Sequence, residues 1–343
     1  MTRQVTLFGA DNIPCGGLLA GVHLVNALCE KGVDATVAFC SKWTGKHSHP
    51  PIKMNFEPLV YDGKDDALHR FPESGRLGMY VNMAVPTIPL VRLFNEQNPE
   101  NTRAVAWIQG QLLDIAGGQG QCPDLLEYYQ WPRRLVPSAT TARHVAEYTV
   151  DGDTTVLPVG INTSMFFPRV NRGKPIVVAL LRADLRQRNI GVGTRIATRL
   201  AAACGNEVEI HAVGYGCPES MPDPIQVHGE MGQSAFAELL GRAHVLLDPT
   251  TEHGFGLPAM EAIASGCWAV CPDSGANGEY WRWGHMLYEW VGDREQSVDH
   301  AVDLVGHAVS LPRPPIPDGF LERFGWGGLA GKYMEYFDTT WRE

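Results

Sequence analysis

Short apolar runs alternate with amphipathic stretches along most of the chain. The runs have the length of buried parallel strands, and the amphipathic stretches have helical spacing. The expected strands are Gln4–Phe8, Val33–Phe39, Leu77–Met83, Thr102–Ile108, Pro175–Leu181, Glu207–Gly214, His244–Asp248 and Cys267–Cys271. The expected helices are Leu18–Lys31, Thr140–Tyr148, Val192–Cys204, Ala235–Arg242 and Glu295–Leu311. This alternation predicts an α/β chain built from Rossmann-like βαβ units.

The stretch Thr250–Gly266 joins two of these strands through a glycine loop and a helix. Pro258 suits the first position of that helix, and Gly266 suits the left-handed residue that ends it. Glycines let the backbone approach a ligand, and a helix start favours an anion such as a phosphate. Glu261 lies about one turn into the helix, so its carboxylate is expected near the loop, where ribose hydroxyls can donate to it. A tight turn whose glutamate only favours the helix dipole has the same spacing.

Glu252-His-Gly-Phe-Gly-Leu-Pro-Ala-Met-Glu261, with Ser265 and Gly266 behind it, resembles the signature of a large glycosyltransferase family. This is the retaining GT-B family that contains many bacterial mannosyl-, glucosyl- and rhamnosyltransferases. Its pattern has two glutamates separated by seven residues around Gly-Phe-Gly-Leu-Pro. Glu261 matches the second glutamate, which in the family holds the nucleotide ribose.

The first glutamate of that pattern has no direct match in this sequence. Its position, beside the donor sugar in the family, falls on His253, and Glu252 lies one residue earlier. Either Glu252 reaches in from a longer loop or His253 takes over. Because the helix start fixes the register of Gly254–Leu257, we expect His253 at the donor and Glu252 turned outward or toward the acceptor.

The resemblance extends to other donor contacts. It implies that Arg182 binds the donor diphosphate together with Arg188, for which Arg186 is the rival, although three arginines also suit a solvated surface loop. The remaining residues implied at the donor are Gly16, Gly17, Gly229, Glu230, Met231, Gly254, Phe255, Gly256 and Leu257. Of these, Gly229–Met231 match the segment that grips the nucleobase, and Gly16 and Gly17 match the loop that faces the donor phosphates.

Two stretches of the amino-terminal half are candidates for the acceptor side. Residues 40–56 carry Lys42, Trp43 and Lys46 and no acidic residue, which suits either a solvated loop or a rim for an anionic or sugar acceptor. Gln109 follows a strand at which many members of the family carry a histidine. No general base is therefore nominated there.

The sequence passage 155–168 resembles the connection between the domains of the same family, a valine-rich strand that runs into Pro158, Gly160 and Pro168. The implied fold is GT-B, with two Rossmann-like domains facing a central cleft. We expect an acceptor-side domain over residues 1–168 and a nucleotide-sugar-binding domain over 169–319. Helices over 320–343 are expected to cross back to the first domain.

Composition sets limits on this interpretation. The chain has 343 residues and a formal net charge of −10, with 13 Lys and Arg against 16 Asp and Glu in residues 1–160. This acidity argues against a general polyanion binder. No apolar run approaches the roughly 20 residues of a membrane span, and the cysteine spacing suggests reduced thiols, so we expect a cytoplasmic protein with no integral membrane segment.

The resulting hypothesis is a retaining glycosyltransferase that needs no metal or other cofactor and takes a nucleotide sugar as its donor substrate. Its hydroxyl acceptor is a glycan, a lipid, a small molecule or modified DNA, because the basic aromatic loop also suits the hydroxymethylated bases of phage-type DNA. A sugar-nucleotide epimerase, a phosphorylase and an inactive nucleotide-sugar-binding protein remain alternatives on the same scaffold.

Overall fold

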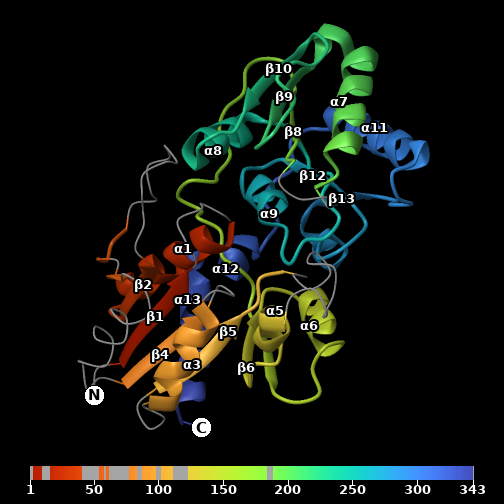
Figure 1. Cartoon of the computed structure of the whole chain (residues 1–343). Helices are drawn as coiled ribbons and strands as arrows, with labels where there is room; N and C mark the ends of the chain where they lie inside the picture. The colour runs from red at the N-terminus through yellow and green to blue at the C-terminus, as the bar shows by residue number, and fades with distance from the viewer. Residues whose placement is uncertain are drawn as a thin grey trace. The chain divides into compact units, whose positions relative to one another are not determined.

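The chain divides into two compact units. The computed structural model describes residues 3–9, 16–40, 54–57, 59–61, 77–82, 87–97, 102–110, 123–183 and 188–342. One unit consists of residues 1–160 together with 324–343, and the other consists of residues 161–323 (Figure 1). Each unit is built on its own parallel sheet.

The first unit contains a sheet with the strand order β3-β2-β1-β4-β5-β6-β7, and every pairing in it is parallel. Its strands are β1 (Arg3–Gly9), β2 (Asp34–Cys40), β3 (Leu59–Tyr61), β4 (Leu77–Asn82), β5 (Thr102–Trp107), β6 (Arg133–Val136) and β7 (Asp153–Val156). The order reverses between β1 and β4, as in a doubly wound Rossmann sheet.

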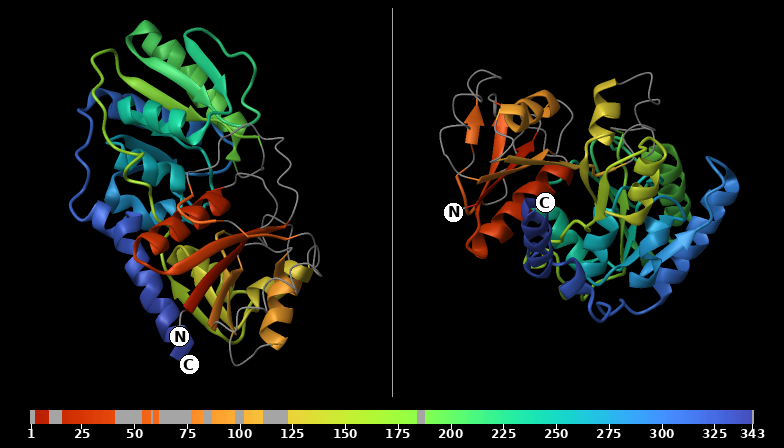
Figure 2. Two further views of the ribbon diagram at one scale, coloured as in Figure 1. Left: turned by 90° about the vertical axis from the view of Figure 1, so that its left-hand side faces the viewer. Right: turned by 90° about the horizontal axis from the view of Figure 1, so that it is seen from below.

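Helices α1 (Gly16–Glu30), α3 (Ile88–Gln97), α5 (Pro123–Tyr129), α6 (Ala139–Ala146) and α13 (Trp326–Arg342) accompany this sheet. The last of them, α13, lies beside α1 although the two are far apart in the sequence (Figure 2). The Tyr333 hydroxyl on α13 donates to the main-chain oxygen of Pro158 at 3.2 Å. The carboxyl-terminal helix is therefore part of the core of the first unit.

The second unit has a parallel sheet with the order β10-β9-β8-β11-β12-β13. Its strands are β8 (Ile176–Leu180), β9 (Glu209–Val213), β10 (Ile225–Gly229), β11 (Val245–Leu247), β12 (Trp268–Pro272) and β13 (His285–Tyr288). Its helices are α7 (Ile190–Cys204), α8 (Gln233–Arg242), α9 (Leu257–Ala264), α10 (Asn277–Tyr280), α11 (Glu295–Ser310) and α12 (Phe320–Phe324), the last of which ends at the boundary of the unit.

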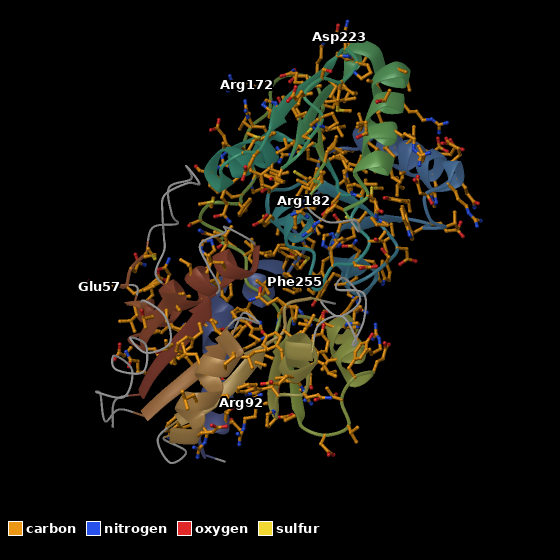
Figure 3. All side chains as sticks on the ribbon, viewed as in Figure 1. Glu57, Arg92, Arg172, Arg182, Asp223 and Phe255 are labelled. Carbon is orange, nitrogen blue, oxygen red and sulfur yellow. The ribbon has the colours of Figure 1, made fainter. Side chains whose placement is uncertain are left out.

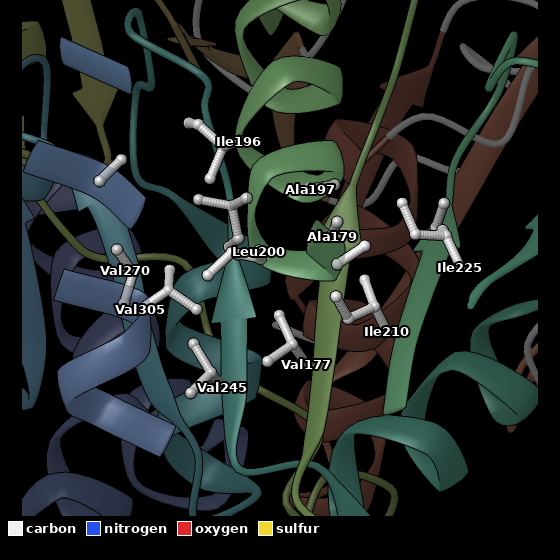
Figure 4. Close-up of a cluster of buried hydrophobic side chains, with 14 of the residues drawn as sticks. Val177, Ala179, Ile196, Ala197, Leu200, Ile210, Ile225, Val245, Val270 and Val305 are labelled. Carbon is white, nitrogen blue, oxygen red and sulfur yellow. The ribbon is translucent and has the colours of Figure 1, made fainter. Parts of the chain in front are cut away.

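The core of the second unit forms where α7 and α11 cover one face of its sheet (Figure 4). Ile196 and Leu200 on α7 pack with Val305 on α11 and with Val177 and Val245 of the sheet. Their side chains are at most 2% exposed. The near-continuous apolar strands of the sequence thus reflect a sheet buried on both faces.

The structure confirms the expected strand–loop–helix unit around residue 250 and corrects it in detail. Gly266 has a φ of +72° and follows the last residues of α9, as expected for a left-handed helix end. The first helical residue is Leu257, however, and Pro258 is second. Gly16 and Gly17 belong to the first turn of α1 and not to a loop. Glycine is tolerated in a first turn, where the main-chain N–H groups have no partner within the helix.

Some elements were not expected from the sequence, namely β3, β13, α3, α5 and α10. Over the part of the chain that the structure describes, no helix combines the length and the hydropathy needed to cross a membrane.

Candidate functional site

The strand order of the second sheet places two loops side by side at its carboxyl edge. Strands β8 and β11 are neighbours, with Ala179 paired to Leu247, and the chain order of the sheet reverses between them. Ligands of doubly wound sheets bind at such a reversal. Arg182 follows β8, and the segment from Asp248 to Gly256 follows β11. The sequence-predicted residues of both loops therefore meet at one edge.

Arg182 is half-buried and offers two hydrogen-bond donors (labelled in Figure 3). Its Nε and Nη2 atoms are buried and meet no acceptor among the residues that the structure describes. Buried guanidinium nitrogens without partners are costly. The charge of Arg182 lowers the pKa values of both Asp248 and Glu261, so the guanidinium lies close to these two carboxyls. An anionic ligand at this edge would satisfy it.

The start of α9 has no side-chain cap. Gly256 is its N-cap residue, with a left-handed φ of +80°, and it provides no side chain to bond the first N–H groups. A Cβ at Gly256 would lie 3.1 Å from Oδ1 of the buried Asn277, so a larger residue would be both strained and crowded. Phe255 anchors the loop by an edge-to-face contact with Tyr280, with 5.1 Å between the ring centroids.

Glu261 faces Arg182 and Gln233. Burial raises the pKa of the Glu261 carboxyl to about 8, and the charge of Arg182 and a hydrogen bond with Gln233 oppose that rise. Gln233 is the first residue of α8, and its Oε1 atom is buried without a hydrogen-bond partner in the described structure. Gln233 was not predicted from the sequence. The available signal was its position two residues after Gly229–Met231, which resemble the nucleobase contact.

His253 and Glu252 differ sharply in exposure. The His253 side chain is 5% exposed, whereas Glu252 is exposed. The Nε2 atom of His253 lies 3.1 Å from Oδ2 of Asp248, which is fully buried. Of the two residues, His253 is the buried one, and which of them contacts a donor sugar stays a prediction.

Asp248 was not nominated from the sequence, where it is only the last residue of an expected strand. Its Oδ1 atom accepts hydrogen bonds from the Thr250 main-chain N–H at 3.1 Å and from the Thr250 hydroxyl at 2.6 Å. Burial by itself would raise the pKa of this carboxyl. The nearby His253, with Arg182 and Thr250, outweighs burial and holds the pKa well below its ordinary value.

Asn189 ties the loop after β8 to the loop after β11. Its backbone is left-handed, with a φ of +50°, and its Nδ2 atom donates to the Pro249 oxygen at 3.0 Å and to the Thr251 hydroxyl at 3.2 Å. Arg188 precedes it directly and is half-buried. Arg186 lies outside the described residues, so the structure does not compare it with Arg188.

Gly229 ends β10 at the same edge of the sheet. Its φ is +64°, and its main-chain oxygen accepts a hydrogen bond from the Gly214 N–H at 2.7 Å. Glu230 is exposed and Met231 is half-buried in the connection to α8. The three residues predicted to contact a nucleobase therefore lie two strands away from Arg182 along the sheet.

In the first unit, two residues predicted for different roles are in contact. The Nε2 atom of Gln109, which follows β5, donates to the main-chain oxygen of Gly17 at 3.4 Å. Gly16 precedes Gly17 in the first turn of α1. The predicted acceptor-side residues Lys42, Trp43 and Lys46 lie outside the described residues.

Known proteins are similar to this chain in sequence and in fold. No protein-family model matches it. An α-(1→4)-mannosyltransferase of Mycolicibacterium hassiacum, named for its action on MMP, is 27% identical over an alignment of 245 residues, and the match covers 64% of this chain. The matched stretch spans only 55% of the length of that mannosyltransferase.

Solved structures of similar fold cover nearly the whole chain. TarM of S. aureus, in a complex that contains UDP, has a TM-score of 0.73 at 9% identity and covers 98% of this chain and 100% of its own. Sucrose-phosphate synthase from Thermosynechococcus elongatus has a TM-score of 0.69 at 15% identity, with 98% of each chain covered. HepE of Anabaena, bound to UDP and glucose, has a TM-score of 0.69 at 11% identity, and the match covers 98% of this chain and 99% of the HepE chain.

These likenesses extend over both parallel sheets, because they cover nearly the whole chain. The resemblance drawn from the sequence is confirmed, and the chain has the GT-B fold of glycosyltransferases.

Proposed function

We propose that this chain is a glycosyltransferase that moves a sugar from a nucleotide-sugar donor to a hydroxyl acceptor. The observation that carries the proposal is the Arg182 guanidinium, whose buried Nε and Nη2 atoms meet no acceptor in the described part of the chain. Arg182 lies at the reversal of strand order beside the uncapped start of α9. A cation and a helix N-terminus are thus both available to a diphosphate.

The similar proteins support a nucleotide sugar over other diphosphates. The relative from Mycolicibacterium hassiacum is named as a mannosyltransferase, and two of the similar folds are complexes that contain UDP. In this proposal Arg182 and Arg188 bind the diphosphate, and Glu261 accepts hydrogen bonds from the ribose. The nucleobase lies against Gly229–Met231.

We further propose that the reaction retains the anomeric configuration and uses arginines where other transferases use a metal ion. The bond from the sugar C1 atom to the phosphate oxygen breaks as the bond to the acceptor oxygen forms on the same face. The acceptor proton passes to the leaving phosphate, so no protein base is required. Arg182 and Arg188 stabilise the charge that develops on that phosphate.

Thermal unfolding with a panel of ligands tests the donor. UDP, GDP, dTDP and their sugar conjugates are added in the presence of EDTA, and a donor at a hundred times its Kd should stabilise the protein by about 2.7 kcal/mol. Arg182→Gln should remove that effect. Arg242→Gln, which changes an exposed arginine on α8, is the matched control and should keep it. Absence of any nucleotide-dependent stabilisation in the wild type would contradict the proposal.

Product analysis then separates transfer from the rival activities. The donor that stabilises the protein is incubated with and without glycan, lipid, small-molecule and hydroxymethylated DNA acceptors. Transfer requires an acceptor and yields the same anomer as the donor by NMR. Donor consumed without acceptor would indicate an epimerase or a hydrolase instead. Turnover that EDTA abolishes and a divalent cation restores would overturn metal independence.

A further inference from the structure

Two histidines on neighbouring strands of the second sheet form a hydrogen-bonded pair. Nδ1 of His211, on β9, lies 2.8 Å from Nε2 of His228, on β10. The two rings are nearly parallel, with 13° between their planes and 5.0 Å between their centroids. His211 is 8% exposed, whereas His228 is exposed on the edge strand of the sheet. One ring of the pair is therefore buried and the other is open to protons from the solvent.

His228 is the extra residue of a β-bulge. The register of β10 against β9 shifts between Val227 and Gly229, so His228 has no partner in the ladder. Bulges occur often beside binding sites, where they end the pairing of a strand or change its direction. Gly229 follows with a left-handed φ of +64° and begins the predicted nucleobase segment Gly229–Met231. The bond to His211 thus anchors the unpaired residue directly before that segment.

The bulge is also close to the arginine proposed to bind the diphosphate. The main-chain oxygen of Gly229 accepts a hydrogen bond from the Gly214 N–H at 2.7 Å. Gly214 has a φ of +141°, and a Cβ there would collide with the Leu181 main-chain oxygen and lie 2.8 Å from Cγ of Arg182. The end of β10 therefore reaches Arg182 through one intervening residue.

The hydrogen bond between the rings limits how many protons the pair can hold. A bond between two imidazole nitrogens needs one hydrogen and one lone pair, and either ring can supply the hydrogen. The bond can form when both rings are neutral and when one of them is protonated. When both are protonated, both facing nitrogens carry hydrogens and the like charges repel. The bond between His211 and His228 is then lost.

The groups around His211 place this loss on the acid side of neutrality. Burial lowers the pKa of His211, and the charge of His228 lowers it too. The Glu209 carboxylate on the same strand, whose Oε2 lies 3.7 Å from Nε2 of His211, opposes this shift, and Arg242 on α8 adds to it. The neighbouring strand β8 is entirely apolar. His211 is therefore neutral at pH 7.5 and takes up a proton only below its ordinary value of 6.5.

We propose that the pair of His211 and His228 holds the bulge of β10 in the shape in which Gly229–Met231 binds a nucleobase, and that double protonation of the pair weakens nucleotide binding in mild acid. His228 is then a positioning residue, which acts through the segment that follows it. This inference rests on the proposed function, because it takes Gly229–Met231 as the nucleobase contact.

Two substitutions at the exposed ring separate its shape from its hydrogen bond. His228→Phe keeps an aromatic ring beside His211 and removes both nitrogens. In His228→Gln, the side-chain amide can donate to a neutral His211 through its nitrogen or accept from a protonated one through its oxygen. Affinities for UDP, GDP and inorganic pyrophosphate are measured by calorimetry between about pH 7.5 and about pH 5. EDTA is present throughout, so that no divalent ion bridges the two rings.

At about pH 7.5, His228→Phe should bind the nucleoside diphosphate about two- to ten-fold more weakly than the wild type, the effect of one net hydrogen bond. His228→Gln should bind it nearly as well as the wild type. As the pH falls, the wild type should approach His228→Phe, whereas His228→Gln should keep its advantage. Affinities are compared at the same pH, which cancels the titration of the ligand's own phosphate. Pyrophosphate lacks the base, so its affinity should be the same in the three proteins.

Two further measurements separate positioning from a general loss of structure. His307→Phe changes an exposed histidine on α11 and should follow the wild type at every pH. Hydrogen exchange at the Gly214 amide, which bonds to Gly229, reports on the bulge directly. At about pH 7.5 it should be faster in His228→Phe than in His228→Gln, while exchange in β12 stays unchanged.

The outcomes distinguish the inference from the proposed function. If the wild type binds neither nucleotide, the proposed function fails and the inference fails with it. If the wild type binds a nucleotide but His228→Phe binds it equally well at about pH 7.5, the inference alone is overturned. The same conclusion follows if His228→Gln loses affinity in acid as steeply as the wild type, or if exchange at Gly214 does not differ between the two variants.

Discussion

The side-chain amide of Gln109 reaches across to α1 and donates a hydrogen bond to the main-chain oxygen of Gly17, with 3.4 Å between the atoms. The contact joins the carboxyl end of β5 to the first turn of a helix that precedes it by about ninety residues. A Cβ at Gly17 would lie 2.7 Å from the Gln109 Oε1 atom. The glycine is therefore what allows the amide to approach the helix.

Gly17→Ala should displace Gln109 without unfolding the protein. The crowded atom is the far end of a flexible side chain, so it can move away, and alanine also favours the helix. We expect Gln109→Ala to lower the free energy of unfolding by about 0.5–1.5 kcal/mol in the wild type and by almost nothing in Gly17→Ala. Urea denaturation of the four proteins measures this coupling. The exposed Gln130, changed to alanine, should give additive values instead.

Arg182→Gln should act on the diphosphate part of a nucleotide. The buried nitrogens of Arg182 are available to an anion. The substitution should therefore weaken binding of a nucleoside diphosphate by about 1.5–3 kcal/mol and binding of the corresponding nucleoside very little. Calorimetry with both ligands checks this difference. Arg188→Gln should behave in the same way, whereas a damaging Arg186→Gln with a silent Arg188→Gln would mean that the second diphosphate contact lies two residues earlier.

Glu261 should make the ligand-free protein less stable at alkaline pH. Its pKa is raised to about 8, above the ordinary value of 4.5, so the folded state holds a proton that the unfolded state releases. The stabilisation is thus complete below pH 4.5 and is lost as the pH rises through 8. Between pH 6 and 9 the wild type should lose more stability than Glu261→Gln. The exposed Glu219→Gln should follow the wild type.

Replacing Glu261 should also weaken binding of the nucleotide. Glu261→Ala removes the proposed acceptor for the ribose hydroxyls and should cost about 1.5–3 kcal/mol of binding free energy for the nucleoside diphosphate. The 2′,3′-dideoxy nucleotide lacks those hydroxyls and should bind the wild type and the variant equally. An unchanged affinity for the normal nucleotide in a folded Glu261→Ala protein would refute the ribose assignment.

His285 should contribute to unfolding in mild acid. Burial lowers its pKa from 6.5 to about 4, so the unfolded state takes up a proton that the folded state refuses. Stability is retained above pH 6.5 and falls as the pH decreases toward 4, by about 3 kcal/mol for this ring. Between pH 7 and 4, the free energy of unfolding measured by urea denaturation should fall less in His285→Gln than in the wild type. His307→Gln, at an exposed histidine of α11, should lose as much as the wild type.

Local sequence patterns predicted the glycine loop and its helix well, because turn glycines, a proline near the helix start and a left-handed end act over neighbouring residues. The same rules failed for β13, whose four residues His285–Tyr288 do not alternate and follow two tryptophans. Helix α3 is amphipathic but carries Pro89 near its start, and it was overlooked. Short elements such as these are selected by the sheet they join, which a local pattern does not contain.

The partners of the site residues were harder to predict than the residues themselves. Arg182 and Glu261 could be nominated from the family resemblance, but Gln233 lies in another helix and reaches Glu261 only through the fold. Asp248 and His253 are five positions apart in a loop whose path the sequence does not define. Thr250 donates two hydrogen bonds to Oδ1 of Asp248, and the other carboxylate oxygen, Oδ2, is the one that lies near the ring.

The interrupted sequence of the first unit has a consequence for synthesis on the ribosome. Residues 161–323 form a continuous unit, whereas the first unit needs residues 324–343, including α13 beside α1, to complete its core. The half of the protein that is translated first is therefore the half that finishes folding last. About 160 residues are synthesised between the two segments of the first unit, and α1 stays uncovered by α13 during that time. A chaperone that binds nascent apolar surface could bind α1 at this stage.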